Sequence, residues 1–299
     1  MFIDIHAHAF RKRSIGAPVF CTEEEVLQAF DRLKIDMGIL LPVVNPECYP
    51  PQAVEDILDM VDHHPDRFIP YCNVDPRLRS NSDVGDLETV LKRFKAAGCK
   101  GIGEVMPNLP VLDPKVQNLF YSAEKAGMPI VYDGAVQVGL GFGLYDDPGL
   151  PQLEHSLVSY PDLIIFGHGP AFWSELGKLS TPGERGCPYN RFKGQRLLLP
   201  HGPIEEEGVM PKLLRRYPNL MADFSDCTAF NAITRDENFG PRFLSEFEDR
   251  IFYGTDIMGV NMEVPLGDKL ISWKEQGKIS ETTFRKIARE NAEKHFGLK

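Results

Sequence analysis

The chain has no long hydrophobic run, and none of its segments approaches the roughly 18 apolar residues that a membrane-spanning helix needs. Its first residues carry neither the basic region nor the apolar segment of a signal peptide. Basic residues are in the minority, with 33 Lys and Arg against 43 Asp and Glu and a formal net charge of -10. Such a protein lacks the positive surface that nucleic acids and anionic membranes attract. We therefore expect a soluble, cytoplasmic protein with neither of those partners.

Cysteine motifs are also missing. Six cysteines are present, and none forms a C-x2-C pair of the kind that zinc ribbons and redox motifs use. Their wide spacing is typical of reduced, mostly buried thiols. The sequence shows no Gly-rich phosphate-binding loop, no internal repeat, no low-complexity tract and no interdomain linker. We expect one domain that spans residues 1–299.

Short apolar runs separated by helix-length segments recur along the chain. Continuous apolar character is expected of parallel strands whose two faces are both covered. Eight such runs are present: Phe2–Ile5, Met37–Val44, Phe68–Val74, Gly101–Val105, Pro129–Tyr132, Leu163–Phe166, Leu220–Phe224 and Arg250–Tyr253. The sequence thus predicts an α/β fold, a (β/α)8 TIM barrel. An open doubly wound sheet is the alternative, and the eight βα units and the missing phosphate loop count against it.

Helices are predicted between these runs. Thr22 is a suitable N-cap for a helix that begins at Glu23, because acidic residues fill the first turn and apolar residues follow at helical spacing. Four further segments have the same apolar periodicity: Asp86–Ala97, Val116–Ala126, Pro211–Tyr217 and Glu281–Phe296.

The connection between the sixth and seventh predicted strands is unusually long. It covers residues 169–219, and the part from Gly177 to Gly208 is rich in Gly, Pro and charge without a helical period. Connections of this length are often lids or binding loops. We predict an active-site loop insertion here, and a tolerated surface insertion is the alternative.

Reactive side chains concentrate at the carboxyl ends of the predicted strands, where the active site of a (β/α)8 barrel lies. Five of the strands end in or lead directly into such residues: His6 and His8, Glu104, Asp133, His168 and Asp256.

His6 and His8 are two residues apart, so in a strand both side chains project to the same face, about 6–7 Å apart along the backbone. Imidazoles at that spacing can meet one metal ion at about 2.0–2.1 Å each. Alone, the pair is also compatible with two structural histidines. The sequence Gly254-Thr255-Asp256 at the end of the last strand adds a carboxylate and favours a metal site.

Several of these residues belong to segments that together suggest a family. The segments are Ile3-Asp4-Ile5-His6-Ala7-His8, Gly101-Ile102-Gly103-Glu104, Phe166-Gly167-His168-Gly169, Phe252-Tyr253-Gly254-Thr255-Asp256 and Arg289-Glu290-Asn291-Ala292. Over its whole length the chain resembles the amidohydrolase superfamily, and most of all the branch of aminocarboxymuconate semialdehyde decarboxylase-like enzymes and related hydrolases. The resemblance implies that His6, His8 and Asp256 are metal ligands and that Asp256 also accepts a proton.

The fifth strand departs from the family pattern, because Asp133 stands where the family usually has a histidine ligand. A carboxylate can still bind a divalent ion, so we expect one metal on His6, His8 and Asp256, with Glu104 or Asp133 as further ligands. Zn is the expected ion, and the added carboxylates widen the choice to Mn or Fe. Some relatives bridge two metals with a strand-four carboxylate, so binding of a second metal by Glu104 remains an open alternative. The alternative is that Asp133 bonds elsewhere and the metal is weakly held or absent.

His168 opens the long connection, at the place where decarboxylase-like relatives have a catalytic histidine. An imidazole there can polarise a carbonyl or shuttle a proton, and a structural histidine bonded to a backbone carbonyl is the alternative. Three further residues are candidates for substrate binding. Arg235 could clamp a carboxylate or form a surface ion pair, His201 could reach the site if the connection folds over it, and Ser225 could make a polar contact.

The leading hypothesis is metal-assisted hydrolysis of an ester, lactone or amide. The metal would lower the pKa of a bound water to about 7, Asp256 would accept its proton, and His168 would stabilise the oxyanion. The second hypothesis is nonoxidative decarboxylation of a small carboxylic acid, with His168 as the acid that protonates carbon. The third is a barrel that has lost its metal and has a binding role, which only Asp133 favours. A small-molecule partner is expected for the enzyme hypotheses, and a homodimer is compatible with the resemblance.

Overall fold

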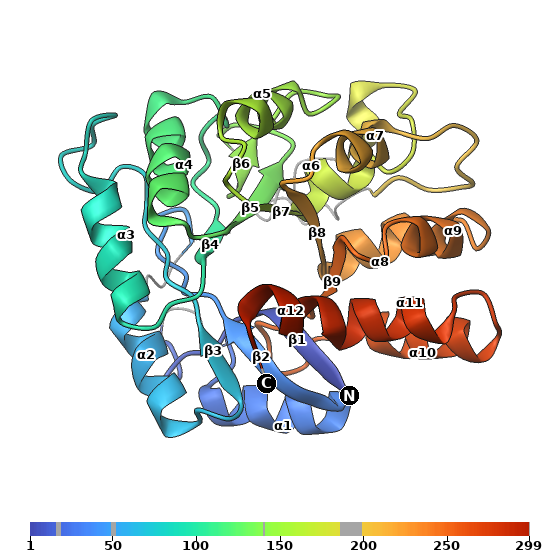
Figure 1. The fold of residues 1–299 in the computed structure, drawn as a ribbon, viewed down its shortest axis with the longest axis horizontal. Helices are drawn as coiled ribbons and strands as arrows, with labels where there is room; N and C mark the ends of the chain where they lie inside the picture. Colours follow the sequence, from blue (N-terminus) through green and yellow to red (C-terminus); the bar gives the residue numbers. More distant parts are fainter. Residues whose placement is uncertain (16–18, 49–51, 140, 186–198, 299) are drawn as a thin grey trace.

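The computed structural model describes residues 1–15, 19–48, 52–139, 141–185 and 199–298. Within them, eight parallel strands alternate with helices along the chain (Figure 1): β1 (Phe2–Ala7), β2 (Ile35–Leu40), β3 (Phe68–Pro70), β4 (Ile102–Val105), β5 (Ile130–Ala135), β7 (Ile165–His168), β8 (Leu220–Phe224) and β9 (Ile251–Tyr253). All eight predicted strands are present. A two-residue strand, β6 (Leu144–Tyr145), also pairs with β5 and was not predicted, because two residues show no periodicity.

The strands form two sheets that meet along two seams. One sheet has the order β1-β2-β3, and the other has the order β4-β5-β7-β8-β9. Single parallel bridges join Cys72 to Ile102 at one seam and Ala7 to Ile257 at the other. At the second seam the Asp4 carboxylate accepts hydrogen bonds from the backbone N–H of Thr255 (3.0 Å) and from its hydroxyl (2.6 Å). The eight strands thus follow one another around a ring in chain order, as a TIM barrel requires.

Helices surround the ring on its outer side (Figure 1). They are α1 (Glu23–Leu33), α2 (Val54–His63), α3 (Leu87–Ala96), α4 (Pro114–Ala126), α5 (Pro151–Ser159), α6 (Gly169–Ser174), α7 (Val209–Arg216), α8 (Asp226–Thr234), α9 (Phe239–Glu246), α10 (Leu266–Glu275), α11 (Glu281–Arg285) and α12 (Asn291–Phe296). Thr22 caps α1 as predicted, and the Glu25 carboxylate accepts its backbone N–H at 2.8 Å. The predicted helix over 281–296 is divided by a π-helical turn (Lys286–Glu290). No helix among the described residues is long and apolar enough to cross a membrane.

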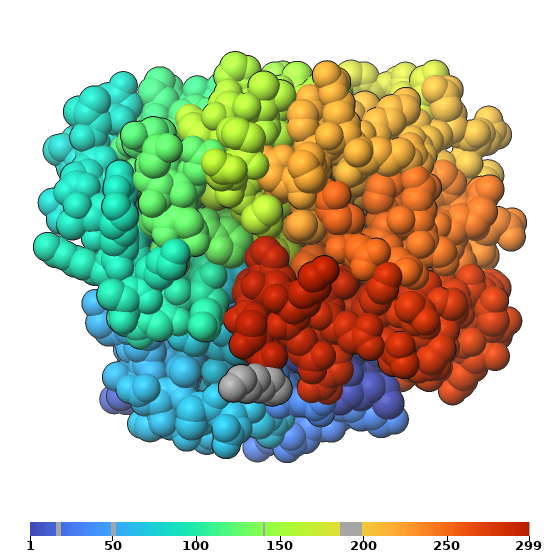
Figure 2. Space-filling view, in the orientation of Figure 1, coloured from blue at the N-terminus to red at the C-terminus, as the bar shows by residue number. Residues whose placement is uncertain are grey.

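The C-terminal helix closes one end of the barrel. Ala292 and Phe296 pack with residues near the amino ends of the strands, among them Ile3 and Phe252. The rings of Phe166 and Phe296 are stacked with centroids 6.1 Å apart. Figure 2 shows this segment, in red, reaching the centre of the face on which both termini lie. The interior is therefore filled with apolar side chains at this end, and the polar residues gather at the opposite, carboxyl end.

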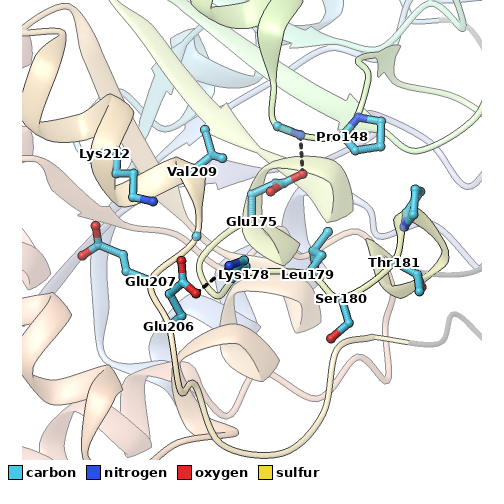
Figure 3. Close-up of a pocket in the computed structure, with 13 residues that line it drawn as sticks. Pro148, Glu175, Lys178, Leu179, Ser180, Thr181, Glu206, Glu207, Val209 and Lys212 are labelled. Atoms are coloured by element: carbon cyan, nitrogen blue, oxygen red, sulfur yellow. Dashed lines mark hydrogen bonds and ion pairs between the residues drawn. The ribbon is translucent and has the colours of Figure 1, made fainter.

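The predicted insertion over 169–219 is not entirely a loop. It begins with α6, contains a short 3-10 helix (Pro182–Arg185) and ends with α7. The backbones of Gly177 and Glu207 are bridged at its base, beside a surface hollow of about 350 Å³ whose rim carries the ion pair between Lys178 and Glu206 (Figure 3). The residues predicted to bind metal or substrate do not line this hollow. Residues 186–198, including Cys187, lie outside the described part of the chain, so the predicted active-site role of the insertion stays a prediction.

Candidate active site

The carboxyl ends of three strands bring four potential metal ligands together. His6 and His8 come from β1 and the residues just after it, Glu104 from β4, and Asp256 from the residues after β9. All four side chains are buried, and the ligand atoms that they offer lie within 4.8 Å of one another. Asp256 has a left-handed backbone with φ of 54°, a conformation that Asp adopts more readily than most residues. Residues 250 positions apart in the sequence therefore meet at the seam between the first and last strands.

The spacing of the four atoms suits one tetrahedral ion. The two Nε2 atoms of His6 and His8 are 3.2 Å apart. Asp256 Oδ1 lies 3.4 Å and 3.3 Å from them, and Glu104 Oε2 lies 3.6 Å from each. Zinc–ligand bonds of about 2.0–2.1 Å place the ligands of a tetrahedral site about 3.3–3.4 Å apart. The donor set and its spacing therefore fit a single zinc-sized cation.

Hydrogen bonds outside the cluster orient both imidazoles. His6 Nδ1 lies 2.6 Å from Asp223 Oδ2, and His8 Nδ1 lies 2.9 Å from the carbonyl oxygen of Leu41. Carboxylate and carbonyl oxygens accept hydrogen bonds, so each Nδ1 carries a proton, which leaves Nε2 as the nitrogen of each ring that can bind a cation. Histidine ligands of metals are commonly supported in this way.

The cluster concentrates carboxylates and imidazoles in a buried space. Asp256 Oδ1 is enclosed and has no hydrogen-bond partner among the described residues. Burial disfavours a charged imidazole, yet the charges of Asp223 and Asp256 raise the pKa of His6 well above its usual value. Burial also opposes ionisation of Asp256, but the positive charges of the neighbouring imidazoles, that of His6 above all, lower its pKa to about 2. In the metal-free chain these charges favour a protonated His6, and a cation that binds here must displace that proton.

A second cluster shares Glu104 with the first. Glu104, Asp133 and His168 also offer ligand atoms within 4.8 Å of one another, and His168 Nε2 lies 3.4 Å from Glu104 Oε1. Asp133 fits closely here, because a Cβ on Gly169 would lie 2.2 Å from its Oδ1 and a Cβ on Gly143 would lie 2.6 Å from its Oδ2. Burial and the negative charge of Glu104 raise the pKa of Asp133 well above its usual value. The structure thus places Asp133 beside the first cluster and not within its four-atom set.

A model of the amidohydrolase family matches residues 3–298. The chain belongs to the amidohydrolase family. No curated protein sequence matches it. The family match covers both clusters, so all the amino acids predicted as metal ligands lie in the family region.

Solved structures with low sequence identity share the barrel. An amidohydrolase from Burkholderia multivorans with bound zinc is 12% identical, with a TM-score of 0.61 and full coverage of both chains (100% and 100%). A probable 2-pyrone-4,6-dicarboxylic acid hydrolase from Acinetobacter baumannii is 14% identical, with a TM-score of 0.57 and 99% of each chain covered. A dihydroxybenzoic acid decarboxylase from Polaromonas sp. JS666, with bound manganese and 2-nitroresorcinol, is 15% identical, with a TM-score of 0.54 and coverage of 99% of this chain and 97% of that chain. At these identities the likeness establishes the TIM-barrel fold.

The three predicted substrate-binding residues of this amidohydrolase are not in the clusters. Ser225 is completely buried and hydrogen-bonds to Asp223 and His168, so its position does not support the predicted substrate contact. Arg235 follows α8, a helix about 13 Å long, and donates to the carbonyl oxygen of Gly202 at 3.3 Å. It therefore joins the insertion to the C-terminal end of α8, and its predicted substrate role stays a prediction. His201 is exposed in the same insertion.

Asp223, whose carboxylate hydrogen-bonds to His6, was not among the residues predicted from the sequence. It lies in β8 within the apolar run Leu220–Phe224 and is fully buried. The sequence does show a single carboxylate inside a continuous apolar strand, and this pattern indicates a functional residue because a buried charge needs a partner. Its partner is far away in the sequence, so the signal does not say which residue it supports.

Proposed function

We propose that the chain is a metal-dependent hydrolase that acts on a small carbonyl substrate, such as an ester, a lactone or an amide. The observation that carries this proposal is the set of four ligand atoms from His6, His8, Glu104 and Asp256, spaced for one cation. Zn is the proposed ion, because two imidazoles in a tetrahedral set suit it, with Mn or Fe as alternatives. When bound, such an ion polarises a carbonyl oxygen and lowers the pKa of a water molecule.

The chain's own residues supply orientation and proton transfer. The low pKa of Asp256 keeps its carboxylate ionised, so it can bind a cation and accept a proton transiently from the attacking water. His168 lies on the other side of Glu104, with Nε2 facing Oε1. When protonated, His168 can stabilise negative charge on a carbonyl oxygen. It can also donate the proton on its Nε2 to the leaving group. Glu104 Oε1 lies 3.4 Å from Nε2 of this ring, and Asp223 Oδ2 lies 3.7 Å from its Nδ1.

Nonoxidative decarboxylation of a small carboxylic acid is the second candidate. The position of His168 beside the cluster favours it, because an imidazole there can also deliver a proton to a carbon atom. The Polaromonas structure, a decarboxylase with bound manganese, shares this barrel. Glu104, Asp133 and His168 also offer ligand atoms for a second cation.

Metal analysis followed by a substrate panel tests the proposal. We expect about one zinc per chain after purification without chelators and reconstitution, and hydrolysis of at least one ester, lactone or amide. The panel includes small carboxylic acids with detection of carbon dioxide. Release of carbon dioxide without hydrolysis would replace the first candidate by the second. Substoichiometric metal after reconstitution with Zn or Mn would contradict both and leave the metal-free binding role.

Four further properties are predicted from the sequence and belong to this proposal. They are a cytoplasmic location, a small-molecule substrate, no nucleic-acid or membrane partner, and a homodimer. The oligomeric state is measurable by light scattering on the reconstituted protein.

A further inference from the structure

The hydroxyl group of Ser225 joins two side chains near the clusters. Ser225 follows β8 and is fully buried. Its Oγ lies 2.7 Å from Asp223 Oδ1 and 3.1 Å from His168 Nδ1. A hydroxyl has one proton to donate and a carboxylate can only accept, so the proton of Ser225 goes to Asp223. The contact with His168 must then be donated by Nδ1–H of the imidazole.

The same carboxylate also holds His6. Asp223 Oδ2 is 2.6 Å from His6 Nδ1, so its two oxygens serve different partners. Space for this arrangement comes from Gly254, where a Cβ would lie 2.9 Å from the Cβ of Ser225 and 3.1 Å from that of His6. The indole N–H of Trp173 donates to the backbone oxygen of Asp223 at 3.1 Å and fixes the strand. The serine, the carboxylate and the two histidines therefore form one packed unit.

The direction of these bonds decides which nitrogen of His168 faces the site. With the proton on Nδ1, the neutral ring presents the lone pair of Nε2 toward Glu104 Oε1, 3.4 Å away. The centroids of the His6 and His168 rings are 4.5 Å apart. The opposite tautomer would leave Nδ1 without a proton to donate to Ser225.

We propose that Ser225 is a positioning residue that fixes the tautomer and orientation of His168, through the carboxylate that also orients His6. The inference rests on the proposed function, in which His168 takes and returns a proton at Nε2 while Nδ1–H stays bonded to Ser225. Ser225 makes no contact with the reacting atoms. Its effect is to keep Nε2 as the proton-accepting atom of the neutral ring.

The test is the variant Ser225→Ala in the zinc-loaded protein, with histidine labelled by 15N. Proton–nitrogen correlation spectra distinguish protonated from unprotonated ring nitrogens, and His168→Gln identifies the signals of His168. We expect Nδ1 protonated and Nε2 unprotonated in the neutral ring of the unsubstituted protein, and a mixture of tautomers in Ser225→Ala. Ser225→Thr keeps the hydroxyl and should restore the single tautomer.

Two further measurements separate positioning from folding. In Ser225→Ala we expect zinc affinity within about 3-fold of the parent, because the His6–Asp223 bond remains, while kcat falls about 100-fold, the lower range of general acid–base effects, at unchanged KM. Ser174→Ala is the matched control, since it removes another buried hydroxyl, one that donates to the carbonyl oxygen of Ala171.

The outcomes are distinguishable from failure of the proposed function. An unprotonated Nδ1 in the parent protein, or an unchanged tautomer in Ser225→Ala, would overturn the inference whatever the activity. Absence of hydrolysis together with the expected tautomers would contradict the proposed function and leave the role of Ser225 in orienting His168 intact.

Discussion

The two side-chain clusters at the carboxyl ends of the strands share Glu104 but differ in how their other members are held. In the first cluster, His6 and His8 each have a partner on Nδ1, and Asp256 stays ionised. In the second, Asp133 lies beside another carboxylate, and its raised pKa favours the protonated form in the metal-free chain. The first set of atoms is thus arranged to receive a cation, whereas in the second set burial and the neighbouring carboxylate favour a protonated Asp133. Identical ligand types can differ in this way because burial and neighbouring charges decide which form is stable.

Loss of a ligand from the first cluster should have the largest effect. For Asp256→Asn we expect zinc affinity to fall by well over the roughly 100-fold that loss of a supporting partner produces, and hydrolysis to disappear. Inductively coupled plasma analysis and competition with a chelating dye measure this. Asp113→Asn is the control, because it is the same change at a helix N-cap where either residue accepts the backbone N–H. Full zinc occupancy in Asp256→Asn would remove the distinction between the clusters.

Loss of the hydrogen bond that orients His6 should have the second-largest effect. Asp223→Asn leaves the ligands in place but weakens the hydrogen bond to His6, so zinc affinity should fall by about 10- to 100-fold. The same dye competition measures it, and circular dichroism checks the fold. If the affinity is unchanged, the contact between His6 and Asp223 does not prepare the site.

Zinc binding should depend on pH because of the proton on His6. The carboxylates raise its pKa well above the usual value, so a metal must displace a proton over the neutral range. Affinity should therefore rise with pH, by about tenfold per unit for each proton released, until pH passes the raised pKa. Calorimetry in buffers of different ionisation enthalpy counts the protons. Binding without proton release at neutral pH would contradict the assigned state of His6.

Changes in the second cluster should matter less for the metal. In Asp133→Asn we expect the zinc content to stay at about one per chain and the affinity to change by less than about tenfold, because Asp133 lies outside the four-atom set. Asp133→His, which installs the usual family residue, is the companion variant. A fall from two metals to one in Asp133→Asn would show that the second cluster also binds a cation.

The smallest effect is expected at Arg235, which caps the C-terminal end of α8 and contacts the insertion. Arg235→Ala should leave kcat/KM within about 3-fold and lower the melting temperature by only a few degrees, since one contact with Gly202 is lost. Arg235→Lys serves as the control for charge. An increase in KM of more than about tenfold in both variants would instead support the carboxylate clamp predicted from the sequence.

The sequence alone determined the barrel and most of the site. Eight apolar runs predicted eight strands because buried parallel strands need apolar residues on both faces. The rule that barrel active sites lie at the carboxyl ends then selected His6, His8, Glu104, His168 and Asp256, which the structure brings close together.

Only the tertiary structure decided which atoms face one another. Asp223 and Ser225 lie more than 200 residues from His6, so no local pattern links them, and only barrel closure brings them together. The structure also places Asp133 outside the four-atom set, in a group with Glu104 and His168. Periodicity specifies which side of a strand a residue occupies, whereas hydrogen-bond direction and pKa depend on neighbours that the chain supplies from other strands.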